Sequence, residues 1–151
     1  MAQRPARNRL APSAADVRRL PWPRRLLSGK HLSSKESYEA GRLLVQKVWD
    51  GKVDLRRTKV KAWPVRRVCE VLGISRYRLT RCVQVYALVE QLELRHRLAD
   101  IPASTLLLLK RLPSDKRERV ARRALACGWT GRRMQQEVEA NVSRRAGSKR
   151  V

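Results

Sequence analysis

The fold is decided by residues 65–84, VRRVCEVLGISRYRLTRCVQ. Its first eight residues carry apolar side chains at the i, i+3, i+4 and i+7 spacing of one helix face. They are Val65, Val68, Cys69 and Leu72. Gly73 then tolerates the left-handed backbone that ends many helices, and Ser75 is a preferred first residue for a second helix. Two helices joined by a short glycine-containing turn predict a helix-turn-helix.

The apolar residues of this stretch fit the packing that a helix-turn-helix needs. A small residue, Cys69, lies where the second helix would cross the first, and Leu79 lies deep in the second helix. Around Cys69, Gly73 and Leu79, further apolar side chains complete the predicted wedge. These are Val68, Leu72, Ile74, Cys82 and Val83.

The polar side chains of the second helix are the candidates for reading DNA bases. They are Ser75, Arg76, Tyr77, Arg78, Thr80, Arg81 and Gln84. Arginine binds guanine through two hydrogen bonds, glutamine binds adenine in the same way, and threonine contacts phosphate or a thymine methyl group. Residues 76–81 contain three arginines and no acid, whereas an ordinary solvated helix mixes both signs. The alternative interpretation is a surface helix of a bundle that is basic by chance.

Basic residues before the second helix are candidates for contacts to the DNA backbone. They are Lys59, Lys61, Arg66 and Arg67. Such contacts position a protein on phosphates without reading sequence.

The flanking sequence is also helical in pattern, so we expect an all-α, multi-helix cluster. A first helix begins at Ser33 or Ser34 and runs to about Trp49. After Pro102 we expect a leucine-rich helix over 103–112. Ser114 caps the next helix, which Gly128 ends, and Thr130 caps a final helix that buries Met134 and Val138. This predicts one all-helical DNA-binding domain over 31–142, with the helix-turn-helix at about 64–90.

The two ends of the chain are basic and lack apolar periodicity, which predicts disordered tails at 1–30 and 143–151. Residues 20–27, LPWPRRLL, are more apolar than a plain tail. They are either a docking segment for a partner or the lead-in to the fold.

Charge narrows the classes of partner. The 151 residues include 36 Lys and Arg against 13 Asp and Glu, a formal net charge of +23. Self-repulsion of this size favours a polyanionic partner, with nucleic acid first and an anionic membrane surface second. No apolar run is long enough for a membrane span or a signal peptide, so we expect a cytoplasmic, nucleoid-associated protein without membrane contact.

Catalysis and metal binding are not expected. Cys69, Cys82 and Cys127 share no zinc-ligand spacing with each other or with His31 and His96. No nucleophile pair, acid pair or glycine-rich phosphate loop is present. We therefore expect no enzyme activity, cofactor, metal or small-molecule substrate.

Three ordered stretches resemble the central DNA-binding domain of ParB-type partition proteins and KorB-like repressors. The first is residues 68–75 with 79–85, the second is 97–104 with 106–108, and the third is 112–115 with 126–132. The similarity covers residues 64–140, about half of the chain. The family's Gly-His-Ala signature is replaced by Pro102-Ala103-Ser104, and its N-terminal nucleotide-binding module has no counterpart. The resemblance implies DNA binding by residues 75–84, supported by the later helices, without nucleotide hydrolysis or sliding.

These patterns predict a sequence-specific double-stranded-DNA-binding protein that places a recognition helix in the major groove. Transcription regulation, plasmid partition and chromosome segregation are the processes considered. The alternatives are a non-specific nucleoid-associated or RNA-binding protein and a DNA-bound adaptor that recruits another protein. A homodimer or a protein partner is left open, because no dimer stripe is visible.

Overall fold

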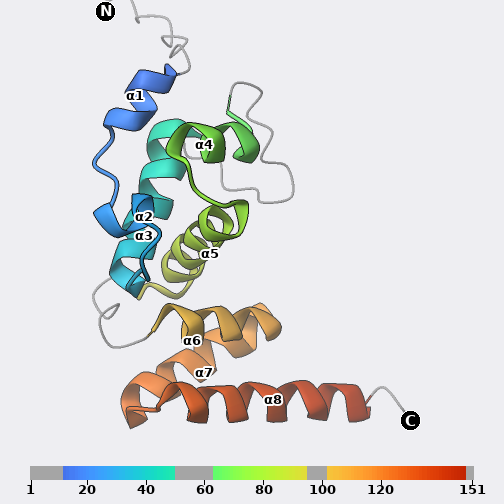
Figure 1. The fold of residues 1–151 in the computed structure, drawn as a ribbon. Helices are drawn as coiled ribbons and strands as arrows, with labels where there is room; N and C mark the ends of the chain where they lie inside the picture. Colours follow the sequence, from blue (N-terminus) through green and yellow to red (C-terminus); the bar gives the residue numbers. More distant parts are fainter. Residues whose placement is uncertain (1–11, 50–62, 95–101, 149–151) are drawn as a thin grey trace, which may run out of the picture.

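A computed structural model describes residues 12–49, 63–94 and 102–148, and within these ranges the chain is helical without strands (Figure 1). The eight α-helices of these ranges are α1 (Ala14–Arg19), α2 (Arg24–Leu27), α3 (Ser34–Leu43), α4 (Val65–Leu72), α5 (Arg76–Leu92), α6 (Ala103–Leu108), α7 (Ser114–Cys127) and α8 (Gly131–Ser148). A π-helical turn, Leu44–Val48, extends α3, and a 3₁₀ turn, Leu109–Arg111, extends α6. The all-α prediction is confirmed.

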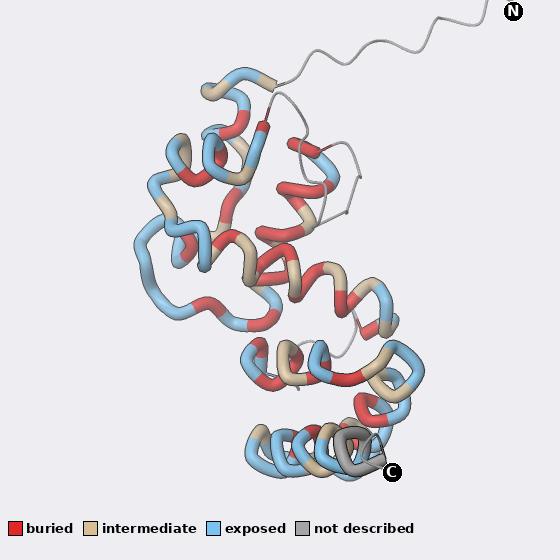
Figure 2. Tube along the Cα trace, turned by 90° about the vertical axis from the view of Figure 1, so that its right-hand side faces the viewer, coloured by how far each residue is buried: buried red, intermediate tan, exposed pale blue. Residues whose placement is uncertain are grey.

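Helix α5 is the centre of the structure, with α3 packed along it and α6 and α7 at its C-terminal half (Figures 1 and 2). Helices α3 and α5 touch almost backbone to backbone at Gly41. A Cβ atom at Gly41 would lie 2.4 Å from the Cys82 carbonyl oxygen and 2.7 Å from the Tyr86 Cβ. Only glycine permits this approach, although glycine is a poor helix former.

Residues 12–32, which we call the N-terminal segment, pack onto the helical core. The side chains of Val17, Trp22 and Leu26 are buried, and the Trp22 indole N–H donates to the Val17 carbonyl at 2.7 Å. The prediction of a disordered arm over 1–30 is therefore wrong for residues 12–30, while residues 1–11 lie outside the described ranges. Burial of Trp22 against its own chain fits the lead-in to the fold rather than an open docking segment.

Two further tryptophans join the N-terminal segment to α4. The Trp49 indole N–H donates to the Trp63 carbonyl at 2.9 Å, and the Trp63 indole N–H donates to the Pro12 carbonyl at 2.8 Å. Trp49 and Trp63 are both fully buried. Because each buried N–H has an acceptor, these large apolar side chains are buried without leaving a donor unpaired.

Helices α6, α7 and α8 form a lower tier below α5 (Figure 1). Met134 and Val138 of α8 are buried as predicted, and the Thr130 hydroxyl caps α8 by accepting the Arg133 N–H at 3.2 Å. Ser114 is not the cap of α7, since Pro113 precedes the helix and no side chain caps it. The predicted tail at 143–151 is also corrected for residues 143–148, because α8 continues to Ser148, while residues 149–151 lie outside the described ranges.

Replacement of Gly41 by alanine is expected to destabilise the protein by about 1–3 kcal/mol or more, because the new methyl group overlaps the α5 backbone. The change is informative because glycine-to-alanine substitution in a helix is otherwise stabilising by about 0.5–1 kcal/mol. Urea unfolding followed by far-UV circular dichroism measures the free energy of unfolding. Lys35→Ala, at an exposed position of the same helix, is the matched control. A Gly41→Ala protein as stable as this control would contradict the close contact.

Candidate nucleic-acid interface

Three residues, 73–75, join α4 to α5. Gly73 ends α4 in the left-handed conformation, with φ of 67° and ψ of 35°, and its N–H donates to the Cys69 carbonyl. The Ile74 N–H donates to the same carbonyl at 3.1 Å. The Ser75 hydroxyl begins α5 by accepting the Arg78 N–H at 3.2 Å. The predicted helix end and helix start are both confirmed.

The predicted packing residues lie on the inner side of these two helices. Val68, Cys69, Leu79, Cys82 and Val83 are all buried. Leu72 and Ile74 are half-buried against the same core. The turn is therefore held by an apolar wedge below it, and its outer side remains open.

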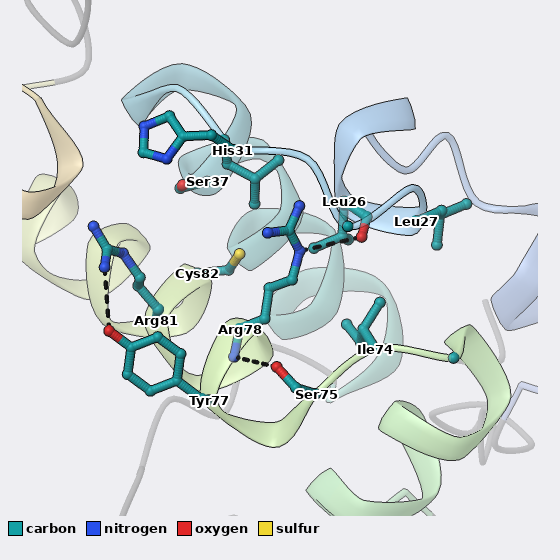
Figure 3. Close-up of a pocket in the computed structure, with 13 residues that line it drawn as sticks. Leu26, Leu27, His31, Ser37, Ile74, Ser75, Tyr77, Arg78, Arg81 and Cys82 are labelled. Carbon is teal, nitrogen blue, oxygen red and sulfur yellow. Dashed lines mark hydrogen bonds between the residues drawn. The ribbon is translucent and has the colours of Figure 1, made fainter.

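The predicted base-reading residues are not equally exposed. Ser75, Arg76 and Tyr77 are exposed, and Tyr77 most of all, at 73%. Thr80, Arg81 and Gln84 are half-buried along the same helix. An Arg81 guanidinium N–H donates to the Tyr77 hydroxyl at 3.3 Å, so these two side chains lie together one turn apart (Figure 3).

Arg78 is turned away from this group. Its guanidinium donates to the Leu26 carbonyl at 3.2 Å (Figure 3) and also to the carbonyls of Arg25 and Lys30. These acceptors belong to the end of α2 and the turn that follows it, where helix carbonyls lack partners within the helix. The structure thus gives Arg78 a structural contact with the N-terminal segment, in contrast to the base-reading role that the sequence suggested.

Arg66 and Arg67 are exposed near the start of α4. Arg66 pairs with Glu70 at 3.1 Å, and both side chains are largely solvated. The Arg67 guanidinium lies 4.1 Å from the centroid of the Trp63 ring. A solvated ion pair is worth little, so Arg66 can exchange Glu70 for another anion at small cost. Lys59 and Lys61 lie outside the described residues.

The N-terminal segment next to α5 is a part of this surface that the sequence interpretation missed. It brings the exposed side chains of Leu27 and His31 beside α5. The signal that pointed to it was the apolar character of residues 20–27 in a basic context.

Cysteines at the α4–α5 wedge are shielded. Burial raises the pKa of the Cys69 thiol, and deeper burial raises the pKa of the Cys82 thiol to about 11. The Arg78 and Arg81 charges act in the opposite direction on the Cys82 pKa but do not overcome burial. The described cysteines are all free thiols, and Cys127 is exposed.

Within the described ranges, two other features are absent: a cluster of metal ligands and a membrane-spanning helix. There, no cluster of three or more His, Cys, Asp or Glu side chains could hold a metal ion. None of the helices described has both the length and the apolar character needed to span a bilayer. Comparison with family models, with curated proteins and with solved structures gave no match.

Arg78→Met is expected to lower the free energy of unfolding by about 1–3 kcal/mol, because three backbone carbonyls lose a charged donor. Hydrogen exchange should accelerate at the amides of Ser28 and Lys30, which bond within the segment that Arg78 holds. The control is Arg76→Met, which removes an exposed arginine of the same helix and should change stability by less than about 0.5 kcal/mol. Equal free energies of unfolding for the two variants would contradict a structural role for Arg78.

Thiol labelling at about pH 8 is expected to give one fast equivalent, at Cys127, because a thiol of raised pKa carries little of the reactive thiolate. Cys69 and Cys82 should react only on unfolding. A chromogenic disulfide reagent measures the rate, with Cys127→Ser as the control in which the fast phase is lost. A fast phase that survives this substitution would mean that the wedge is open.

Proposed function

We propose that this chain binds double-stranded DNA, with α4 and α5 as a helix-turn-helix and the first turns of α5 in the major groove. The observation that carries the proposal is the start of α5, where Arg76 and Tyr77 are exposed and Arg81 donates to the Tyr77 hydroxyl, without an acidic residue from 76 to 81. Guanidinium and phenol groups on an exposed helix start match base edges and phosphates. The net charge of +23 supplies the attraction that draws such a face to a polyanion.

The order of the helices is compatible with the resemblance to the ParB and KorB DNA-binding domain, which remains part of the proposal. A pair of helices around a glycine turn is followed by the leucine-rich α6 and by α7, which pack against α5, and by α8, which packs against α6. In this interpretation the lower tier supports the reading head. Transcription control and plasmid or chromosome partition are both compatible with such a domain, and either would place the protein on the nucleoid.

We exclude Arg78 from the proposed reading set because its donors bind carbonyls of the N-terminal segment. The remaining base-reading candidates are Ser75, Arg76, Tyr77, Thr80, Arg81 and Gln84. Arg66 and Arg67 keep their proposed role at phosphates.

Selection of bound fragments from a random duplex pool should yield a consensus, and binding to it should survive excess random duplex. Arg76→Gln or Arg81→Gln should weaken binding to the selected site by about 1–3 kcal/mol, because each loses a two-pronged base contact. Arg119→Gln, at an exposed position of α7 with the same change in charge, is the matched control. Electrophoretic mobility shift or fluorescence anisotropy measures the affinity.

The salt dependence separates base reading from phosphate contact. Arg66→Gln should lower the slope of log affinity against log salt by about one and weaken all duplexes alike. A flat salt dependence would contradict nucleic-acid binding altogether. If no consensus emerges, and if the loss of affinity is equal for Arg76→Gln, Arg81→Gln and Arg119→Gln, the binding is non-specific and electrostatic.

A further inference from the structure

A cleft of about 480 Å³ lies between residues 26–32 and the start of α5 (Figure 3). We call it the α2–α5 cleft. Its volume is within the range of about 300–1,000 Å³ that small-molecule sites occupy. It differs from the proposed DNA face in that part of its lining comes from the N-terminal segment, namely Leu26, Leu27, Gly29, His31 and Leu32.

One end of the α2–α5 cleft is apolar. Leu27 and Ile74 lie at this end (Figure 3), with the fully buried Leu26 behind them. Among the described residues, the exposed large apolar side chains are Leu27, at 47%, and Tyr77, at 73%, and both line this cleft, Leu27 at the apolar end and Tyr77 beside Arg81 (Figure 3). Exposed apolar groups that gather at one concave site indicate a binding surface more than scattered ones do.

The other end is polar and basic. His31, Ser37 and Arg81 lie toward this end, away from the leucines (Figure 3). No aspartate or glutamate lines the cleft. Arg81 has the Tyr77 hydroxyl as a hydrogen-bond acceptor but no ion pair with a carboxylate in the described part of the chain. A guanidinium has five N–H donors, so Arg81 retains donors for an anion.

We propose that the α2–α5 cleft binds a small organic anion with an apolar body, such as an aromatic carboxylate or sulfonate. The anionic group pairs with Arg81, and the apolar body lies against Leu27 and Ile74. Arg78 keeps the cleft in shape, because its bonds to the carbonyls of Arg25, Leu26 and Lys30 hold the two walls together.

The site has a regulatory consequence that rests on the proposed function. Ser75, Tyr77 and Arg81 belong both to the cleft and to the proposed DNA face. An anion paired with Arg81 therefore competes with duplex DNA for the same donor. Each ligand must weaken the other by the same factor, since coupling between two equilibria is reciprocal.

Two fluorescent probes with nearly the same aromatic body test the site in the absence of DNA. The anionic probe is 8-anilino-1-naphthalenesulfonate, and the uncharged probe is N-phenyl-1-naphthylamine. The full chain should bind the sulfonate at one saturable site and more tightly than the amine. Arg81→Gln should weaken the sulfonate by about fivefold or more, because it loses a charge-assisted bond, and leave the amine unchanged. Leu27→Asn should weaken both probes.

Arg76→Gln is the matched control, because it removes the same charge from the same helix outside the cleft. If Arg76→Gln and Arg81→Gln weaken binding of the sulfonate equally, its binding reflects only the general surface charge, and the proposal is overturned. Lack of saturable binding would do the same. Because these titrations contain no DNA, their failure is separate from a failure of DNA binding. In a chain that binds duplex, added duplex should release the sulfonate, and retention of it would overturn the competition.

Discussion

The contact of α3 with α5 at Gly41 is the constraint on which the other packing depends. Glycine lets the α3 backbone reach the Cys82 carbonyl, which places Tyr38 5.4 Å from Tyr86, measured between ring centroids, and lets the Tyr38 hydroxyl donate to Glu90 at 2.6 Å. With one side of α5 covered so closely by α3, α4 and the N-terminal segment fill the positions beside it. The opposite end of α5 remains for α6 and α7. The outward face at its start follows from this arrangement.

The basic side chains divide into those that hold the fold and those that face solvent. Arg117 repeats what Arg78 does: its guanidinium donates to the carbonyls of Leu109, Leu112 and Lys110 at 2.7–3.1 Å. Both arginines supply charged donors to carbonyls at the end of a helix, where the helix dipole favours a cation. The net charge of +23 therefore exceeds the positive charge that is free to attract a polyanion. The proposal of DNA binding rests on the arginines that have no such internal partners.

Local patterns predicted the helices well, because caps and apolar periodicity are encoded within a few residues. Ser33, Gly73, Ser75 and Gly128 all mark helix ends as expected. The errors came from contacts distant in sequence. The basic composition of residues 12–30 suggested a disordered arm, although Trp22 and Leu26 are buried in the core. Arg78 has the same sequence character as Arg76 and Arg81, and only its contact with residues 25–30 in the fold distinguishes it. The sequence alone does not indicate which arginine of α5 faces inward, because this depends on how α5 packs against a segment about 50 residues away in the chain.

The inward turn of Arg78 also changes how α5 can act. Because one side chain binds three carbonyls of the N-terminal segment, the first turns of α5 and residues 25–30 keep a fixed relation to each other. A rigid pair of walls is a better host for a ligand than two independent ones, since less ordering is needed on binding. Arg81, about one turn after Arg78, and Tyr77, the residue before it, make no such bonds to the N-terminal segment. The same helix thus combines a fixed arginine, Arg78, that builds the cleft with a pair of side chains, Tyr77 and Arg81, that is able to exchange partners.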